Sequence, residues 1–145
     1  MTEPNIQMAY DYLSRACWLD EEINTKMQRL QNLRSSADLV TSFFGREKIT
    51  SSRNDNAVED HVLRIMEAEE ELNRDIDRLI SIKVEIGEMI SRIREVPLRL
   101  VLEKRYLCYL EWSQIAEEMH YSTRWIKCMH KTALEKVQRI LEEAA

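Results

Sequence analysis

The chain has 145 residues with only two Gly and two Pro, and helix-forming residues dominate it. So few turn formers exclude a sheet-rich fold with many tight turns and predict an all-α protein. The net charge of −5 at first argues against a nucleic-acid partner. However, residues 1–96 carry 13 Lys/Arg against 19 Asp/Glu, whereas residues 97–145 carry 8 against 7, so a local basic stripe can exist near the C-terminus.

The cysteines and the N-terminal sequence bear on the cellular compartment. Cys17, Cys108 and Cys128 form no CxxC pair, which is typical of a reduced protein whose thiols pack as small apolar groups. The first twenty residues mix charged and apolar positions, unlike a secretory signal peptide. No apolar run approaches the length of a membrane span. We therefore expect a cytoplasmic protein that does not contact a membrane.

The first expected helix runs from about residue 4 to residue 44. Pro4 suits its first turn, with Thr2 or Asn5 as the cap. Its apolar residues recur in steps of four and three, the heptad pattern by which one helix lies along another. Lys26 alone interrupts this seam, which is formed by Tyr12, Ala16, Leu19, Ile23, Leu30, Leu33, Ala37, Val40 and Phe44. We expect Gly45 to end the helix and a loop to span residues 45–56.

A second long helix is expected from about residue 57 to residue 94, because Asn56 and Glu59 resemble a capping box. Glu69 and Lys83 are the polar exceptions in its seam, which is formed by Val58, Val62, Ile65, Leu72, Ile76, Leu79, Ile86, Ile90 and Ile93. Two helices of similar length with matching seams predict a long antiparallel helical hairpin, a coiled coil, over residues 1–95. Such a rod can hold a partner or form a homodimer, and the sequence leaves both open.

The break at Val96-Pro97 predicts a second domain over residues 96–145. Helices are expected at 97–107, at 111–119 and from Ser122 to about Leu141. The second and third of these helices have helix-turn-helix spacing, because Ala116 is small where two helices cross and Ile126 returns to the core ten residues later. The expected inward positions are Ile115, Met119, Ile126, Met129, Ala133, Val137 and Ile140.

The outward face of the last helix is the candidate DNA-binding surface. No acidic residue occurs between Met119 and Leu134. Arg124 can pair bidentately with guanine, and hydroxyl and ammonium groups can hold phosphates. A solvated charged face would show the same composition. The DNA-binding candidates are Ser122, Thr123, Arg124, Trp125, Lys127, Cys128 and Lys131, with Arg124, Trp125 and Cys128 as the base-contacting ones.

The segment from Leu98 to Leu141 resembles region 4 of sigma-70-type factors, through Arg105-Tyr106, Ile115-Ala116, Ser122, Ile126-Lys127 and Ala133-Leu134. The whole chain is similar to short phage and prophage proteins that join a helical hairpin to such an end, the ArpU/RinA-type late transcription regulators. Trp112, Tyr121-Ser122, His130 and the SSRN stretch at 51–54 fit that group.

This resemblance implies a phage-encoded transcription regulator that binds double-stranded promoter DNA in a bacterial host cell. It implies an accessory factor acting with host RNA polymerase, since the chain has no room for a DNA-melting domain. Two positions depart from the family pattern. His120 replaces the usual turn glycine, and Glu111 replaces a Ser or Thr cap, so fraying is expected at that helix start.

Two other functions remain open. The chain could bind RNA polymerase or another protein through the hairpin without specific DNA binding, or it could package DNA like a small terminase subunit. An enzyme is not expected, because the sequence has no Gly-rich phosphate loop and no nucleophile motif. A zinc site from Cys108, His120, Cys128 and His130 is not expected either, since Cys128 and His130 diverge by about 200° on one helix. We expect neither a metal nor a cofactor.

Overall fold

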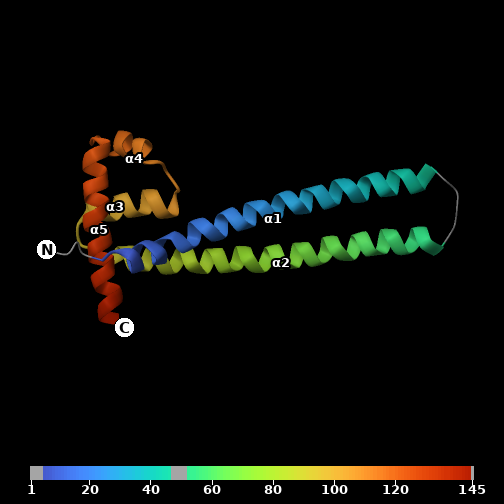
Figure 1. Cartoon of the computed structure of the whole chain (residues 1–145), viewed down its shortest axis with the longest axis horizontal. Coiled ribbons are helices and arrows are strands. Elements are labelled where there is room, and N and C mark those ends of the chain that lie inside the picture. The colour runs from blue at the N-terminus through green and yellow to red at the C-terminus, as the bar shows by residue number, and fades with distance from the viewer. Residues whose placement is uncertain (1–4, 47–51, 145) are drawn as a thin grey trace. The chain divides into compact units, whose positions relative to one another are not determined.

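The computed structural model describes residues 5–46 and 52–144, with side-chain surroundings for residues 5–38 and 57–144. These residues are helical apart from short turns and contain no strand, which confirms the predicted all-α class. The helices are α1 (Gln7–Arg46), α2 (Ser52–Ser91), α3 (Val96–Leu102), α4 (Trp112–Met119) and α5 (Thr123–Ala144), and a π-helical turn, η1 (Glu103–Leu107), follows α3 directly (Figure 1). None of the described helices is long and apolar enough to cross a membrane.

Both long helices extend into the segment expected to be the 45–56 loop. α1 continues through Gly45, and α2 already begins at Ser52. A single glycine costs a helix only about 1 kcal/mol. Ser, Asn and Asp suit the start of a helix, so α2 can begin before Asn56. Residues 47–51, Thr2 and Pro4 lie outside the described residues, whereas Asn5 Oδ1 accepts a hydrogen bond from the Gln7 N–H at 3.0 Å, as expected of a cap.

The chain divides into two compact units. The middle unit is Asp20–Arg78, and the terminal unit combines Met1–Leu19 with Leu79–Ala145. The sequence predicted a division between residues 95 and 96 instead. The terminal unit thus holds the first turns of α1 and the last turns of α2 together with α3, α4 and α5.

Within the middle unit, α1 and α2 lie side by side and run in opposite directions (Figure 1). Lys26 forms ion pairs with Glu71, at 3.0 Å, and with Asp75. Arg34, two turns further along α1, pairs with Glu69, which is earlier on α2. Lys26 and Glu69, two of the three polar exceptions in the predicted seams, therefore hold ion pairs between the helices. These pairs help to set the register.

The predicted seams form only part of a core in the middle unit. Ile23, Leu30 and Leu72 are buried, but Val62, which was expected to be in the seam, is 48% exposed. Two helices shield only the narrow stripe between them, and positions on its flank stay open. Other seam residues are half-buried: Leu33, Ala37, Val58, Ile65 and Ile76. The side chains of Val40 and Phe44 lie outside the described part.

In the terminal unit, α3 and α4 both pack against α5 (Figure 1). The predicted inward positions Ile126, Met129, Ala133 and Val137 are confirmed as buried, while Ile140 is half-buried. On α1 the seam positions Ala16 and Leu19 are buried as expected, and Ala9, Leu13 and Ser14 are buried as well, whereas the seam position Tyr12 is half-buried. The first turns of α1 therefore follow the predicted seam except at Tyr12, where the neighbouring Leu13 takes the buried position.

Gln138 is a buried polar residue of α5, only 3% exposed, that the sequence reasoning missed. Its Oε1 accepts a hydrogen bond from the Ala9 N–H at 2.9 Å, and its Nε2 donates to Glu142 at 3.0 Å. Ala9 lies in the first turn of α1, where backbone N–H groups have no acceptor within the helix. Gln138 thus caps α1 from the other end of the chain.

We expect Gln138→Leu to lower the free energy of unfolding by about 1–3 kcal/mol, because it leaves the buried Ala9 N–H without an acceptor. Urea titration followed by circular dichroism measures the loss. Glu142→Ala is the matched control, since it removes the acceptor of the Gln138 Nε2 bond and leaves the bond to the Ala9 N–H in place. Equal losses in the two variants would show that the capping bond does not stabilise the protein.

Candidate nucleic-acid interface

The connection between α4 and α5 is a left-handed turn. His120 has φ 60° and ψ 38°, in the left-handed region. Its N–H donates to the Glu117 carbonyl at 3.3 Å, and the Tyr121 N–H donates to the Ala116 carbonyl at 3.0 Å. This pair of bonds is a Schellman motif. The motif ends α4 sharply and lets α5 leave in a new direction.

Both helices at the turn have a defined start. Ser122 Oγ accepts a hydrogen bond from the Trp125 N–H at 3.1 Å, so Ser122 caps α5 as expected. At the start of α4, Gln114 Oε1 accepts from the Glu111 N–H at 3.0 Å. The sequence predicted a frayed start at Glu111. In the structure the Gln114 side chain supplies the reciprocal half of a capping box and satisfies the Glu111 N–H.

The inward side chains at the turn match the predicted spacing. Ile115 and Ile126 are completely buried, and Ala116 is 5% exposed. Met119 is half-buried. The small Ala116 side chain permits a close approach of α4 and α5, which pack against each other. These contacts determine which face of α5 points outward.

All seven DNA-binding candidates are exposed: Ser122, Thr123, Arg124, Trp125, Lys127, Cys128 and Lys131. Trp125 is 53% exposed. Tyr121, which the prediction did not include, is 44% exposed directly before Ser122. A large aromatic residue in the turn was the available sequence signal for it. The structure therefore brings these side chains onto one continuous stretch at the start of α5.

One basic residue of α5 is engaged elsewhere. Lys136 Nζ donates to Glu95 at 2.8 Å, and this bond lowers the pKa of the Glu95 carboxyl. The positive charge offered by α5 is consequently concentrated in its first half, where the sequence contains no acidic residue.

Behind this surface, an aromatic cluster joins η1, α4 and α5. His130 Nε2 lies 2.6 Å from the Tyr106 hydroxyl, and the Trp112 ring meets the His130 ring edge-on at 4.5 Å. Arg105 lies over the Trp112 ring, 4.5 Å from its centroid, and donates to the Leu110 carbonyl at 3.0 Å. Arg105 and Tyr106, which carry part of the family resemblance, are therefore packing residues that hold α4 and α5.

Burial keeps this cluster uncharged at its centre. Burial, with a smaller contribution from the nearby Arg105 guanidinium, lowers the pKa of His130 to about 4. Burial also raises the pKa of the Tyr106 hydroxyl. At pH 7 the imidazole is neutral, so Nε2 can accept the hydrogen bond that the Tyr106 hydroxyl donates.

The turn after η1 fixes the cluster to the rest of the terminal unit. Tyr109 has φ 58°, and its hydroxyl donates to the Ala16 carbonyl at 3.4 Å. Lys83, the second polar exception in the predicted α2 seam, lies 4.8 Å from the centroid of the Tyr109 ring. Lys104 forms an ion pair with Glu118 at 2.6 Å. Contacts from α1, α2 and α4 thus hold η1 in place.

The cysteines are not packed as predicted. Cys17, Cys108 and Cys128 are all exposed free thiols. On α5 the apolar positions Ile126 and Met129 take the buried face, which leaves Cys128 outside. Among the described residues, no group of three or more His, Cys, Asp or Glu side chains could hold a metal ion.

Comparison of the chain with protein-family models, curated proteins and solved structures finds no match.

The left-handed turn yields a stability prediction. A side chain with a Cβ pays about 1 kcal/mol or more in the left-handed region, and glycine pays none. We therefore expect His120→Gly to raise the free energy of unfolding by roughly 0.5–1 kcal/mol, and the β-branched His120→Val to lower it. Urea denaturation measures both changes. A loss of stability in His120→Gly would mean that the imidazole stabilises the folded chain by more than the left-handed backbone at this position costs it.

Proposed function

We propose that the chain is a double-stranded-DNA-binding transcription regulator of the phage type, in which α4 and α5 form a helix-turn-helix and α5 is the recognition helix. The observation that carries this proposal is the first half of α5. It exposes Arg124, Lys127 and Lys131 opposite a buried face, and the sequence from His120 to Ala133 contains no acidic residue. A positive, outward helix face on a rigid support is what the major groove requires.

The exposed side chains divide by chemistry into two roles. Lys127 and Lys131, with the Ser122 and Thr123 hydroxyls, suit phosphate contacts that position the helix. The Ser122 oxygen accepts the capping bond, and its own O–H can still be donated to a phosphate. Arg124, Trp125 and Cys128 suit base edges, with Arg124 pairing with guanine.

In this proposal an antiparallel hairpin carries the DNA-binding module, and the regulator acts at promoters with host RNA polymerase. The resemblance of residues 98–141 to sigma region 4 supports this placement.

Mapping the DNA bound by the chain in phage-infected cells tests the proposal. We expect peaks at a late promoter, lost in an Arg124→Ala variant that retains the wild-type expression level. Peaks confined to a packaging site would favour the small-terminase alternative. A chain that co-purifies with RNA polymerase after nuclease treatment, without DNA peaks, would favour the protein-binding alternative.

A further inference from the structure

The outward face of α5 is divided along its length into two strips of different chemistry. At about 100° per residue, one side of this face carries the positively charged residues Arg124, Lys127 and Lys131. The other side carries three exposed residues without charge, Trp125, Cys128 and Thr132. We call the first set the cationic strip and the second the neutral strip. Both lie within residues 123–132, opposite the buried face of the helix.

The neutral strip offers apolar groups to a partner. The Trp125 side chain is 53% exposed. The Thr132 hydroxyl donates to the Cys128 carbonyl at 3.2 Å, so its proton is engaged within the helix and its methyl group adds apolar area. The indole N–H of Trp125 is a donor that can accompany these apolar contacts. A fitting partner therefore presents a small apolar group with a hydrogen-bond acceptor beside it.

The charge around the neutral strip indicates which kind of partner fits. The cationic strip runs alongside it, and the sequence from His120 to Ala133 contains no acidic residue. The acidic residues nearest in sequence at the two ends are Glu118, which is paired with Lys104, and the half-buried Glu135. The chemistry therefore fits a polyanion that carries apolar groups next to its charges.

Duplex DNA is such a polyanion, and thymine is the base that meets both requirements. In the major groove thymine presents a methyl group together with the O4 acceptor, whereas cytosine presents an amino donor and no methyl group. Adenine and guanine carry no methyl group either. Apolar side-chain groups, the threonine methyl among them, contact the thymine methyl in protein–DNA complexes.

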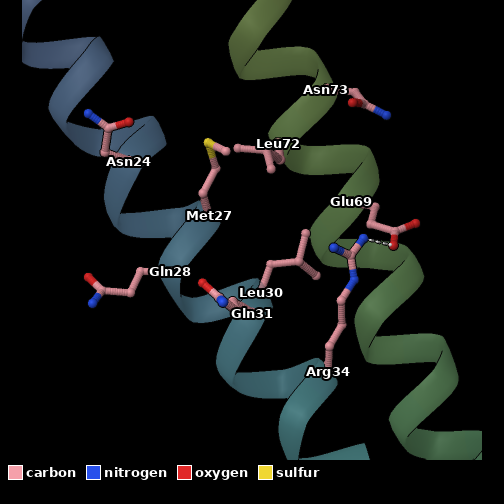
Figure 2. A pocket seen from close by; sticks show the side chains of 9 residues that line it. All are labelled: Asn24, Met27, Gln28, Leu30, Gln31, Arg34, Glu69, Leu72 and Asn73. Atoms are coloured by element: carbon pink, nitrogen blue, oxygen red, sulfur yellow. Dashed lines mark hydrogen bonds and ion pairs between the residues drawn. The ribbon is translucent and has the colours of Figure 1, made fainter.

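The exposed side chain of Met27 lacks this arrangement. Met27 is 50% exposed and borders a hollow of about 830 Å³ between α1 and α2 in the middle unit (Figure 2). The two charged residues that line the hollow, Arg34 and Glu69, are bonded to each other. The lining residues thus include no cationic strip, and Met27 serves as a control position.

We infer that the neutral strip reads the methyl groups of thymine in the major groove, beside the phosphate and guanine contacts of the cationic strip. The inference rests on the proposed function and adds to it the class of base that Trp125, Cys128 and Thr132 contact. It also adds Thr132 to the DNA-binding residues.

The test begins with a pool of short duplexes of random sequence, from which the wild-type chain selects at low salt. Each thymine of the selected duplex is then replaced in turn by deoxyuridine, which lacks only the methyl group. Fluorescence anisotropy measures the affinity. We expect a loss of about fourfold at each contacted thymine, the factor for one buried methyl group.

Two variants connect this loss to the neutral strip. Trp125→Ala keeps the backbone N–H that Ser122 caps, and it should bind the thymine and deoxyuridine duplexes equally at the positions that the indole contacts. Thr132→Ser removes one methyl group and keeps the hydroxyl, so it should reduce the loss at one position. Circular dichroism verifies that each variant is helical.

Two further variants are matched controls. Lys127→Ala should weaken the binding of both duplexes and leave the ratio of their affinities as in wild type, because it removes a phosphate contact. Met27→Ala removes an exposed apolar side chain of the middle unit and should change neither the affinity nor the ratio.

Equal affinity of the wild-type chain for the thymine and deoxyuridine duplexes would overturn the inference and leave the proposed function intact. So would an unchanged ratio in Trp125→Ala, the result expected if this residue contacts a protein partner instead. If Trp125→Ala binds too weakly to measure, Thr132→Ser decides, and a wild-type loss at every thymine rejects the inference. A chain that selects no duplex at low salt fails the proposed function, and the inference with it.

Discussion

Replacing both Arg124 and Lys127 by alanine is expected to weaken binding to a DNA duplex by about 100-fold or more at low salt. A bidentate arginine–guanine pair contributes roughly 1–3 kcal/mol to binding, and each 1.4 kcal/mol changes the dissociation constant by about a factor of ten. Removing a phosphate contact should also reduce the slope of log K against log salt by about 1. Fluorescence anisotropy with a labelled duplex at several salt concentrations measures both quantities.

The matched control for this double variant is Arg64→Ala with Arg74→Ala. It removes two exposed basic side chains of α2 and changes the net charge equally. We expect it to bind DNA nearly as well as the wild-type chain. If the two double variants lost the same affinity, binding would depend on overall charge and not on the face of α5. Unchanged affinity in the Arg124 and Lys127 variant would reject α5 as the DNA-binding element.

Acid should destabilise the terminal unit through His130. Its folded-state pKa of about 4 lies below the usual value of 6.5, so the unfolded chain takes up a proton first as pH falls. The contribution of the neutral His130 side chain to the free energy of unfolding is therefore complete above pH 6.5 and is lost as pH falls from 6.5 toward 4. Its full size is on the order of 3 kcal/mol.

Urea unfolding at a series of pH values measures this loss. His130→Gln removes the titrating group, so its stability should depend less on pH across this window, even if its stability at pH 7 is lower. The same pH dependence in His130→Gln and in wild type would show that carboxyl groups alone cause the acid sensitivity.

The local pattern of the sequence was sufficient to predict the packing around the α4–α5 turn. Helical periodicity fixes which side chains of one helix share a face, so Ile115, Ala116 and Ile126 could be identified as buried. Ser122 could be predicted as a cap because the hydroxyl bonds to a backbone N–H only three residues away. The exposed positions from Arg124 to Lys131 followed from the same periodicity.

Contacts between distant residues were not predictable in this way. Gln138 reads as a polar residue of a helix, and only the position of Ala9, at the far end of the sequence, explains its burial. Likewise, His130 and Tyr106 come from different elements, and no periodicity relates them. The heptad seam also failed to distinguish buried Leu72 from exposed Val62, because the spacing does not say how much of a seam a neighbour covers.

The most direct test of the DNA-binding proposal is a nuclear magnetic resonance titration of the isotope-labelled chain with a short DNA duplex at low salt. Electrostatic binding does not require the specific site, so an arbitrary duplex reports the surface used. The proposal predicts that the largest amide shift changes fall between Tyr121 and Thr132. Changes confined to α1 and α2, or no changes at all, would contradict it.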